Sequence, residues 1–160
     1  PERLRPRIEA MAALFAQGVP FNLDAWDGYP AARERVYRMI RAAQANAVVL
    51  AGDSHAFWAN ELHDANGDRV AVEFGTTGVT SPGWGDFLPN QDLGAIMADQ
   101  NKDVVYSHQS AKGFVRLTLT REAARGELIA VSTITEPTYR TSTLKSYRTP
   151  ARFGAGFSEG

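Results

Sequence analysis

The stretch Ala47-Val-Val-Leu-Ala-Gly-Asp-Ser-His55 decides the fold that the sequence predicts. Its first five residues form a short, continuous apolar run, which is typical of a buried parallel strand. In open α/β sheets, the residues just beyond the carboxyl end of such a strand line the ligand crevice. Asp53 and His55 stand there, two residues apart, so a carboxylate and an imidazole can face one point. Such a pair suits a metal ion or a general acid–base site.

Two other interpretations of this stretch stay open. The Asp53 carboxylate can cap the following turn beside an ordinary surface histidine. Strand-Gly-Asp-Ser also resembles the nucleophile block of the GDSL-type serine hydrolases, with Ser54 as the nucleophile. Those enzymes take their general base from an Asp-x-x-His segment, and neither His63 nor His108 has an aspartate three residues upstream. The esterase therefore lacks its base.

Composition sets broad limits on the chain. Its 160 residues, 44% of them hydrophobic, suffice for one domain with a core. A net charge of −1 gives no field that would recruit nucleic acid or an anionic membrane. The absence of cysteine excludes disulfides, thiolate metal sites and cysteine nucleophiles. No apolar run approaches the roughly 18 residues that span a bilayer. Because the chain begins Pro1-Glu2-Arg3 without methionine, we expect a piece of a longer protein.

Periodicity predicts alternating helices and strands. Apolar spacing indicates a helix over Leu4–Phe15, and Pro30 suits the first position of a helix running to Ala45. Asn66-Gly67 is a strong two-residue hairpin signal between two strands. The further expected elements are strands over Ala56–His63, Arg69–Thr76, Val104–Tyr106, Phe114–Thr120, Glu127–Thr133 and Thr138–Tyr147, and a helix over Asp92–Gln100 capped by Asn90. Residues 149–160 are expected to form a loose tail.

Four segments, taken in order, resemble one known family. They are Asp24–Arg35, Val48–Leu62, Val72–Gly83 and Asn101–Leu117. In order, residue type and spacing they resemble the C-terminal half of the alkaline phosphatase D (PhoD-like) metallophosphoesterases, of the calcineurin-like superfamily. The resemblance implies an α/β (mixed α+β) fold: half of a calcineurin-like β-sandwich with flanking helices. It implies that residues 1–160 are the C-terminal portion of one phosphatase domain, with an ordered core over about residues 20–148.

The resemblance also implies an activity. Members hydrolyse phosphomonoesters or phosphodiesters at a two-metal centre, with iron and calcium the associated ions. By family position, Asp53 and His55 form the Gly-Asp-x-His metal element, and His55 is also a catalytic candidate. The remaining ligands belong to the N-terminal half of the same protein, which becomes the expected partner besides the phosphate ester. The isolated chain is expected to be inactive. Periplasmic or secreted location in a bacterium follows from the resemblance alone.

Lesser candidates surround this pair. Asn60 and Glu61 are expected beside the metal ligands, and Trp26 and Asp27 in an aromatic, acidic loop near them. The segment beginning at Asn101 makes Asp103 and His108 candidates for substrate binding, although Lys102 stands where the family pattern has proline. The alternative function is a non-catalytic binding or structural domain that kept the scaffold.

Overall fold

The computed structural model describes residue 13, residue 17 and residues 22–160, so the helix expected over Leu4–Phe15 lies almost wholly outside the described residues. The chain divides into two compact units, residues 1–39 and 40–160. The first unit contains the 3-10 helix η2 (Trp26–Gly28) and most of helix α2 (Pro30–Ala42). Pro30 begins α2, as predicted. The helix ends before Ala45, because Gln44 adopts a left-handed φ of 49° that a helix cannot continue through.

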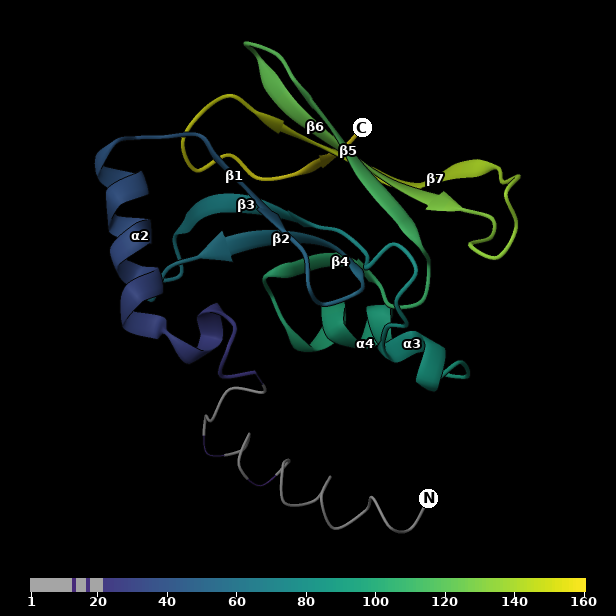
Figure 1. The fold of residues 1–160 in the computed structure, drawn as a ribbon. Helices are drawn as coiled ribbons and strands as arrows, with labels where there is room; N and C mark the ends of the chain where they lie inside the picture. Colours follow the sequence, from purple (N-terminus) through teal and green to yellow (C-terminus); the bar gives the residue numbers. More distant parts are fainter. Residues whose placement is uncertain (1–12, 14–16, 18–21) are drawn as a thin grey trace. The chain divides into compact units, whose positions relative to one another are not determined.

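Two four-stranded sheets form the second unit (Figure 1). The first has the order β1-β3-β2-β4 and the second the order β5-β6-β7-β8. The strands are β1 (Ala47–Ala51), β2 (Phe57–His63), β3 (Arg69–Gly75), β4 (Val104–His108), β5 (Gly113–Leu119), β6 (Ala123–Val131), β7 (Thr141–Pro150) and β8 (Ser158–Glu159). Helices α3 (Trp84–Phe87) and α4 (Leu93–Gln100) lie between β3 and β4 along the chain. The predicted mixed α/β class is confirmed.

Strand β1 is parallel, as predicted, but it is not fully buried. It pairs with β3 in the register Ala47↔Ala71 to Ala51↔Gly75. Among the described residues β3 is its one strand neighbour, and Leu50 is 63% exposed. The apolar run predicted two covered faces, because such runs are typical of central parallel strands. The described structure instead places this run at the edge of the sheet.

The hairpin between β2 and β3 forms at Asn66-Gly67, as predicted. Gly67 adopts a φ of 84°, which glycine reaches without steric cost. The Asp64 carboxylate accepts hydrogen bonds from the backbone N–H groups of Asn66 and Asp68, each at 3.0 Å. Arg41 forms ion pairs with both Asp64 and Asp68. Hydrogen bonds from the backbone to Asp64 and the ion pairs of Arg41 thus both stabilise the turn.

The core lies between the two sheets. Phe57, Ala59 and Phe74 of the first sheet pack with Leu128 and Tyr147 of the second. A side chain at Gly126 would place its Cβ 2.3 Å from the Phe74 ring, so glycine there lets the ring reach the opposite sheet. Full burial stabilises each large side chain by about 1.5–3 kcal/mol. This contact makes the sheets a sandwich.

The tail expected to be loose is ordered. Strand β7 continues to Pro150, and β8 pairs with it through Tyr147↔Glu159 and Arg148↔Ser158. The Phe157 ring centroid lies 5.0 Å from that of Phe74 and 5.2 Å from that of Tyr147. The glycine-rich composition predicted a flexible tail, because glycine loses much conformational entropy when it is ordered. The packing of the Phe157 ring against Phe74 and Tyr147 outweighs that cost.

Several boundaries differ from the expectation: β4 extends beyond Tyr106 to His108, and β7 spans Thr141–Pro150 in place of Thr138–Tyr147. Two further differences have local reasons. The α4 N-cap is Asp92, whose carboxylate accepts from the Ala95 N–H at 3.0 Å, and not Asn90. Strand β6 begins at Ala123, before the expected Glu127, because its antiparallel pairing with β5 extends through residues of low strand propensity.

Across the described part of the chain, no helix is long and apolar enough to cross a membrane.

We predict that the Asp64→Asn variant loses the pH dependence that this turn contributes to stability. Partial desolvation raises the pKa of Asp64, but backbone hydrogen bonds from Asp68 and Asn66 and the Arg41 charge outweigh it and lower the pKa below 3.8. The stabilisation is therefore full above about pH 4 and disappears as the pH falls through the lower folded pKa. Urea unfolding between pH 6 and 2 measures it, and identical curves for variant and parent would contradict the assignment.

Phe157→Ala is expected to lower the free energy of unfolding by about 2 kcal/mol, less than a fully buried phenylalanine because this ring is only partly buried. Phe87→Ala is the control, since that ring is 68% exposed and should change stability by less than about 0.5 kcal/mol. Equal effects of the two substitutions in urea unfolding would show that the tail does not join the core.

Candidate active site

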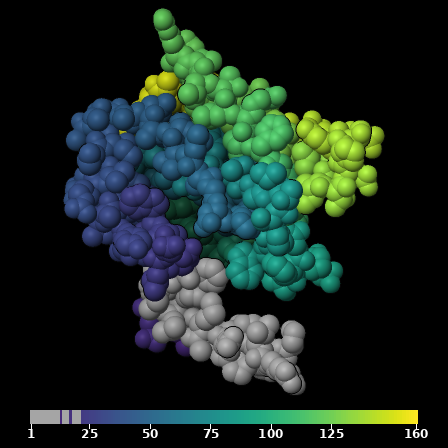
Figure 2. Space-filling view, in the orientation of Figure 1, coloured from purple at the N-terminus to yellow at the C-terminus, as the bar shows by residue number. Residues whose placement is uncertain are grey.

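Asp53, Ser54 and His55 form the turn that leads from β1 to β2. Asp53 has a φ of 65° and His55 a φ of 56°. Aspartate and histidine tolerate the left-handed region better than most residues, yet each such residue stores of order 1–3 kcal/mol. Asp53 and Ser54 are exposed, and the segment after β1 reaches the surface on the face drawn in Figure 2, beside the teal surface of residues 77–100. Strained backbone of this kind gathers at functional sites.

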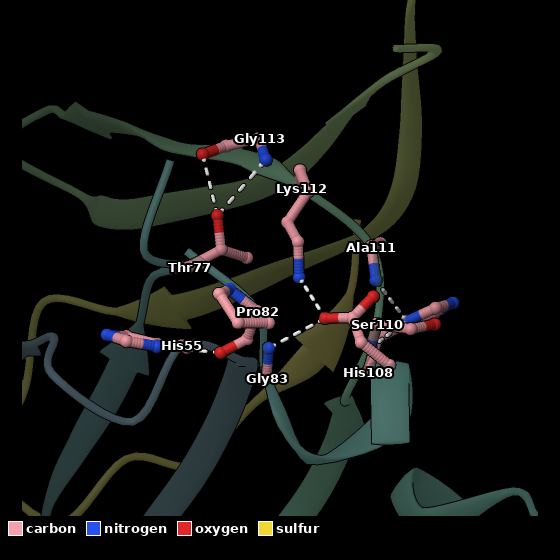
Figure 3. A network of polar contacts seen from close by, with 10 residues as sticks. His55, Thr77, Pro82, Gly83, His108, Ser110, Ala111, Lys112 and Gly113 are labelled. Atoms are coloured by element: carbon pink, nitrogen blue, oxygen red, sulfur yellow. Dashed lines mark hydrogen bonds and ion pairs between the residues drawn. The ribbon is translucent and has the colours of Figure 1, made fainter. Parts of the chain in front are cut away.

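One hydrogen bond fixes the His55 imidazole. Its Nδ1 lies 2.9 Å from the carbonyl oxygen of Pro82 (Figure 3). A carbonyl oxygen only accepts, so in the neutral ring Nδ1 carries the hydrogen and Nε2 carries the lone pair. Metal-bound histidines commonly make this kind of bond through their second ring nitrogen. The geometry leaves Nε2 available as a ligand.

The loop that supplies Pro82 is shaped around His55. A Cβ on Gly78 would lie 2.6 Å from Cδ2 of the imidazole, and one on Gly83 would lie 2.6 Å from the His55 carbonyl oxygen. Val79, in the same loop, has a φ of 46°, which is a genuine outlier for a β-branched residue. The sequence offered this Gly-Val-Thr-Ser-Pro-Gly loop only as part of the family pattern. Its role beside His55 appears only in the structure.

The Asp53 carboxylate is uncommitted. No hydrogen bond or ion pair engages it within the described residues, and the residue is exposed. A carboxylate oxygen and an imidazole nitrogen form a donor pair that suits iron, while the carboxylate also suits calcium. Residues 22–160 contain no group of three or more metal-binding side chains close enough to hold an ion. The described part of this chain therefore offers a donor pair, which is less than a complete metal site.

Ser54 does not have the surroundings of a hydrolase nucleophile. Its hydroxyl accepts a hydrogen bond from the Trp58 indole N–H at 2.8 Å. All three histidines are described, and none hydrogen-bonds Ser54 in this structure. The serine therefore lacks the general base that its activation requires.

The structure separates Asp103 from the candidate site. Strands β2 and β4 run antiparallel, so that Phe57 faces His108 and Asn60 faces Val104. Asp103 lies at the far end of β2, where its Oδ1 is 2.7 Å from Nδ1 of His63. At roughly 3.3 Å per residue, the six steps from Phe57 to His63 span about 20 Å. Asp103 thus lies away from Asp53 and His55. Its contact with His63 joins the end of β2 to the segment before β4.

The backbone of His108, by contrast, lies close to the end of the turn that carries His55. It faces Phe57, two residues after His55. Its Nδ1 accepts from the backbone N–H groups of Ser110 and Ala111 at 3.4 and 3.1 Å, which leaves Nε2 as the protonated nitrogen of the neutral ring. His108 lines a groove of about 780 Å³ together with Tyr106 and the start of α4. Neither Asp53 nor His55 lines that groove.

The remaining expected residues have structural partners. Asn60 donates to Glu73 Oε1 at 2.8 Å, and Glu61 pairs with Arg69 at 2.8 Å while accepting from the Phe157 N–H at 2.7 Å. Trp26 and Asp27 belong to the N-terminal unit, where Asp27 pairs with Arg33 at 2.8 Å. Trp26 is 53% exposed. Within the described part of the second unit, neither Asn60 nor Glu61 makes a hydrogen bond or ion pair with Asp53 or His55.

Comparison with known proteins identifies the family. The family model described as PhoD-like phosphatase matches residues 6–128. The chain belongs to the PhoD-like phosphatase family. It is 34% identical over 133 residues to alkaline phosphatase D of Bacillus subtilis (strain 168), an alignment that covers 79% of this chain and 22% of that protein. A solved structure titled "Structure of PhoD" matches with a TM-score of 0.69 and 30% identity, over 85% of this chain and 26% of the other.

These matches confirm the resemblance drawn from the sequence. The chain spans less than a quarter of the Bacillus protein and about a quarter of the solved chain. The PhoD-like chain therefore corresponds to part of its relatives.

We predict that Gly78→Ala displaces the His55 ring, because the added methyl group would lie 2.6 Å from Cδ2. Overpacking of this kind costs about 1–3 kcal/mol. Urea unfolding and the NMR chemical shifts of the His55 ring measure the two effects. Gly52→Ala is the matched control: it adds the same methyl group three residues before His55, where nothing lies within 4 Å. If both variants leave the His55 signals in place, the close approach of the loop is not real.

Proposed function

We propose that this PhoD-like chain is part of a metal-dependent phosphatase that hydrolyses phosphate monoesters or diesters. One observation supports the assignment of the site. His55 commits Nδ1 to the Pro82 carbonyl oxygen and leaves Nε2 free, two residues from an uncommitted Asp53 carboxylate. Family membership supports the phosphatase chemistry, and the calcineurin-like ancestry is part of the same proposal.

Asp53 and His55 would hold metal ions, which we propose to be iron and calcium because the family resemblance implies them and the donor types suit them. When bound, such ions bind phosphate oxygens and lower the pKa of water so that hydroxide forms near neutral pH. Residues of this chain orient the two proposed ligands. The Pro82 carbonyl oxygen keeps the His55 lone pair at Nε2. The left-handed backbone of the turn sets the positions from which the Asp53 and His55 side chains extend.

His108 is our proposed substrate contact. Two backbone N–H groups hold its Nδ1 as an acceptor, so Nε2 donates from a neutral ring. A neutral donor binds a phosphate oxygen without adding a second charge to the site. Asp103 has no such role in this proposal, because its carboxylate pairs with His63 at the far end of β2.

The partner in this proposal is the rest of a longer PhoD-like polypeptide. The chain matches 22% of the Bacillus relative, and the described residues supply too few metal ligands. Strand β1 leaves one edge without a strand neighbour in the described structure, and Leu50 on it is 63% exposed. A unit of the same polypeptide that brings the other ligands would cover such an edge. We also propose the periplasmic or secreted location, and it rests on the family alone.

Asp53→Asn and His55→Ala, made in the complete polypeptide, are each expected to lower kcat/KM at least about 100-fold, which is about 2.7 kcal/mol of transition-state stabilisation. Each removes a proposed ligand, so metal content measured by mass spectrometry should fall as well. Asp103→Asn is the control, and it should keep both metal and rate because Asp103 lies away from the site. Full metal content and parental rates in both ligand variants would favour the non-catalytic binding or structural domain.

Residues 1–160 alone are expected to hydrolyse p-nitrophenyl phosphate and its bis ester negligibly. A two-metal reaction needs both ions, and the donor pair described here holds neither completely. The measurement is release of p-nitrophenol with added iron and calcium. Robust metal-dependent turnover by the purified chain would contradict the proposed division of ligands.

A further inference from the structure

Asp86 joins two segments that are far apart in the sequence. One carboxylate oxygen, Oδ2, accepts a hydrogen bond from the Gly83 N–H at 2.6 Å and another from Nζ of Lys112 at 2.6 Å. In Figure 3 these are the two dashed lines that run from Gly83 and Lys112 to one carboxylate oxygen. Hydrogen bonding from Lys112, then from Gly83, lowers the pKa of Asp86 below its usual value, so the charged form persists near neutral pH. The carboxylate is thus a two-way link between the loop before α3 and the start of β5.

Lys112 is a firm anchor for this link. Its side chain is only 11% exposed, and a largely buried ammonium group is costly unless it is paired. Its backbone is fixed as well, because the Val131 N–H donates to the Lys112 carbonyl oxygen at 2.8 Å. The neighbouring Gly113 exchanges two hydrogen bonds with the Thr77 hydroxyl, at 2.9 and 3.1 Å. The second sheet therefore holds both ends of the loop over residues 77–83.

The other end of the link reaches His55. Gly83 directly follows Pro82, whose carbonyl oxygen accepts from Nδ1 of His55 at 2.9 Å. The Pro82 carbonyl and the Gly83 N–H belong to the same planar peptide unit, so the position of this carbonyl follows the position of the Gly83 nitrogen. There is little free space around Gly83, since a Cβ there would lie 2.6 Å from the His55 carbonyl oxygen and 2.8 Å from that of Gln109. A displacement of Gly83 would therefore move the acceptor of His55.

We propose that Asp86 and Lys112 are positioning residues for His55: through Gly83 and Pro82 they hold the imidazole in the tautomer whose Nε2 is free for a metal ion. The relevance to catalysis rests on the proposed function, but the effect on the tautomer does not. The simpler alternative is that Asp86 only caps α3 and forms a surface ion pair. In that case His55 would not respond to its loss.

The test is the tautomer of His55 in residues 1–160 without metal, read from two-bond ¹⁵N–¹H correlations of ring-labelled histidine at a pH where the imidazoles are neutral. We expect Asp86→Ala and Lys112→Met each to lower the ratio of Nδ1–H to Nε2–H at His55 roughly fivefold, as the loss of an ordinary hydrogen bond would. Lys112→Arg should restore the parental ratio, because it keeps the charge and the donor.

Asp92→Ala is the matched control. It also removes an aspartate that accepts a backbone N–H, at the start of α4, but Asp92 has no link to Pro82. The signals of His63 and His108 in the same spectra serve as internal references. An unchanged His55 tautomer in folded Asp86→Ala and Lys112→Met, or an equal change in Asp92→Ala, would overturn the proposal.

If Asp86→Ala does not fold, Asp86→Asn is measured in its place. This variant keeps an oxygen that can accept from the Gly83 N–H, but it loses the charge that pairs with Lys112. A shifted ratio in that variant supports the link and a parental ratio overturns it. The proposed function fails separately: a His55→Ala enzyme with full metal content would refute the ligand assignment while leaving the tautomer result intact.

Discussion

The packing of the two sheets through Phe57, Phe74, Leu128 and Tyr147 is the contact on which the rest of this structure depends. Phe57 is fully buried and follows His55 by two residues, so the core holds one end of the turn that carries the candidate ligands. The other end is β1, fixed by parallel pairing to β3. Left-handed conformations at Asp53 and His55 persist because both flanks of the turn are held.

The site also draws on the second sheet. Lys112 and Gly113 lie where the chain enters β5, and they hold the loop over residues 77–83 through Asp86 and Thr77. That loop presents the Pro82 carbonyl oxygen to His55. The carbonyl oxygen that bonds the His55 imidazole thus lies in a loop that is held by residues at the start of the second sheet. In metal sites such outer contacts commonly change affinity 10–100-fold when they are lost.

The described residues form a packed core, but they do not contain a complete group of metal-binding side chains. Aromatic contacts of Phe157 with Phe74 and Tyr147 close the sandwich from the C-terminal side. The described residues nevertheless gather fewer than three metal-binding side chains at any point. The chain spans only 22% of its Bacillus relative, yet it has a well-packed core of its own.

The sequence by itself determined the local features of this protein. The strand over Ala47–Ala51, the Asn66-Gly67 turn and the Pro30 helix start each depend on neighbouring residues, and each is found where the sequence predicts it. Ordered residue types over four segments determined the family. Tertiary structure alone decided that β1 lies at an edge, that Asp103 pairs with His63 away from the site, and that Phe157 orders the tail. It also decided the contact of Pro82 with His55. These features depend on residues far apart in sequence, whose proximity follows from strand order and register, which local patterns do not specify.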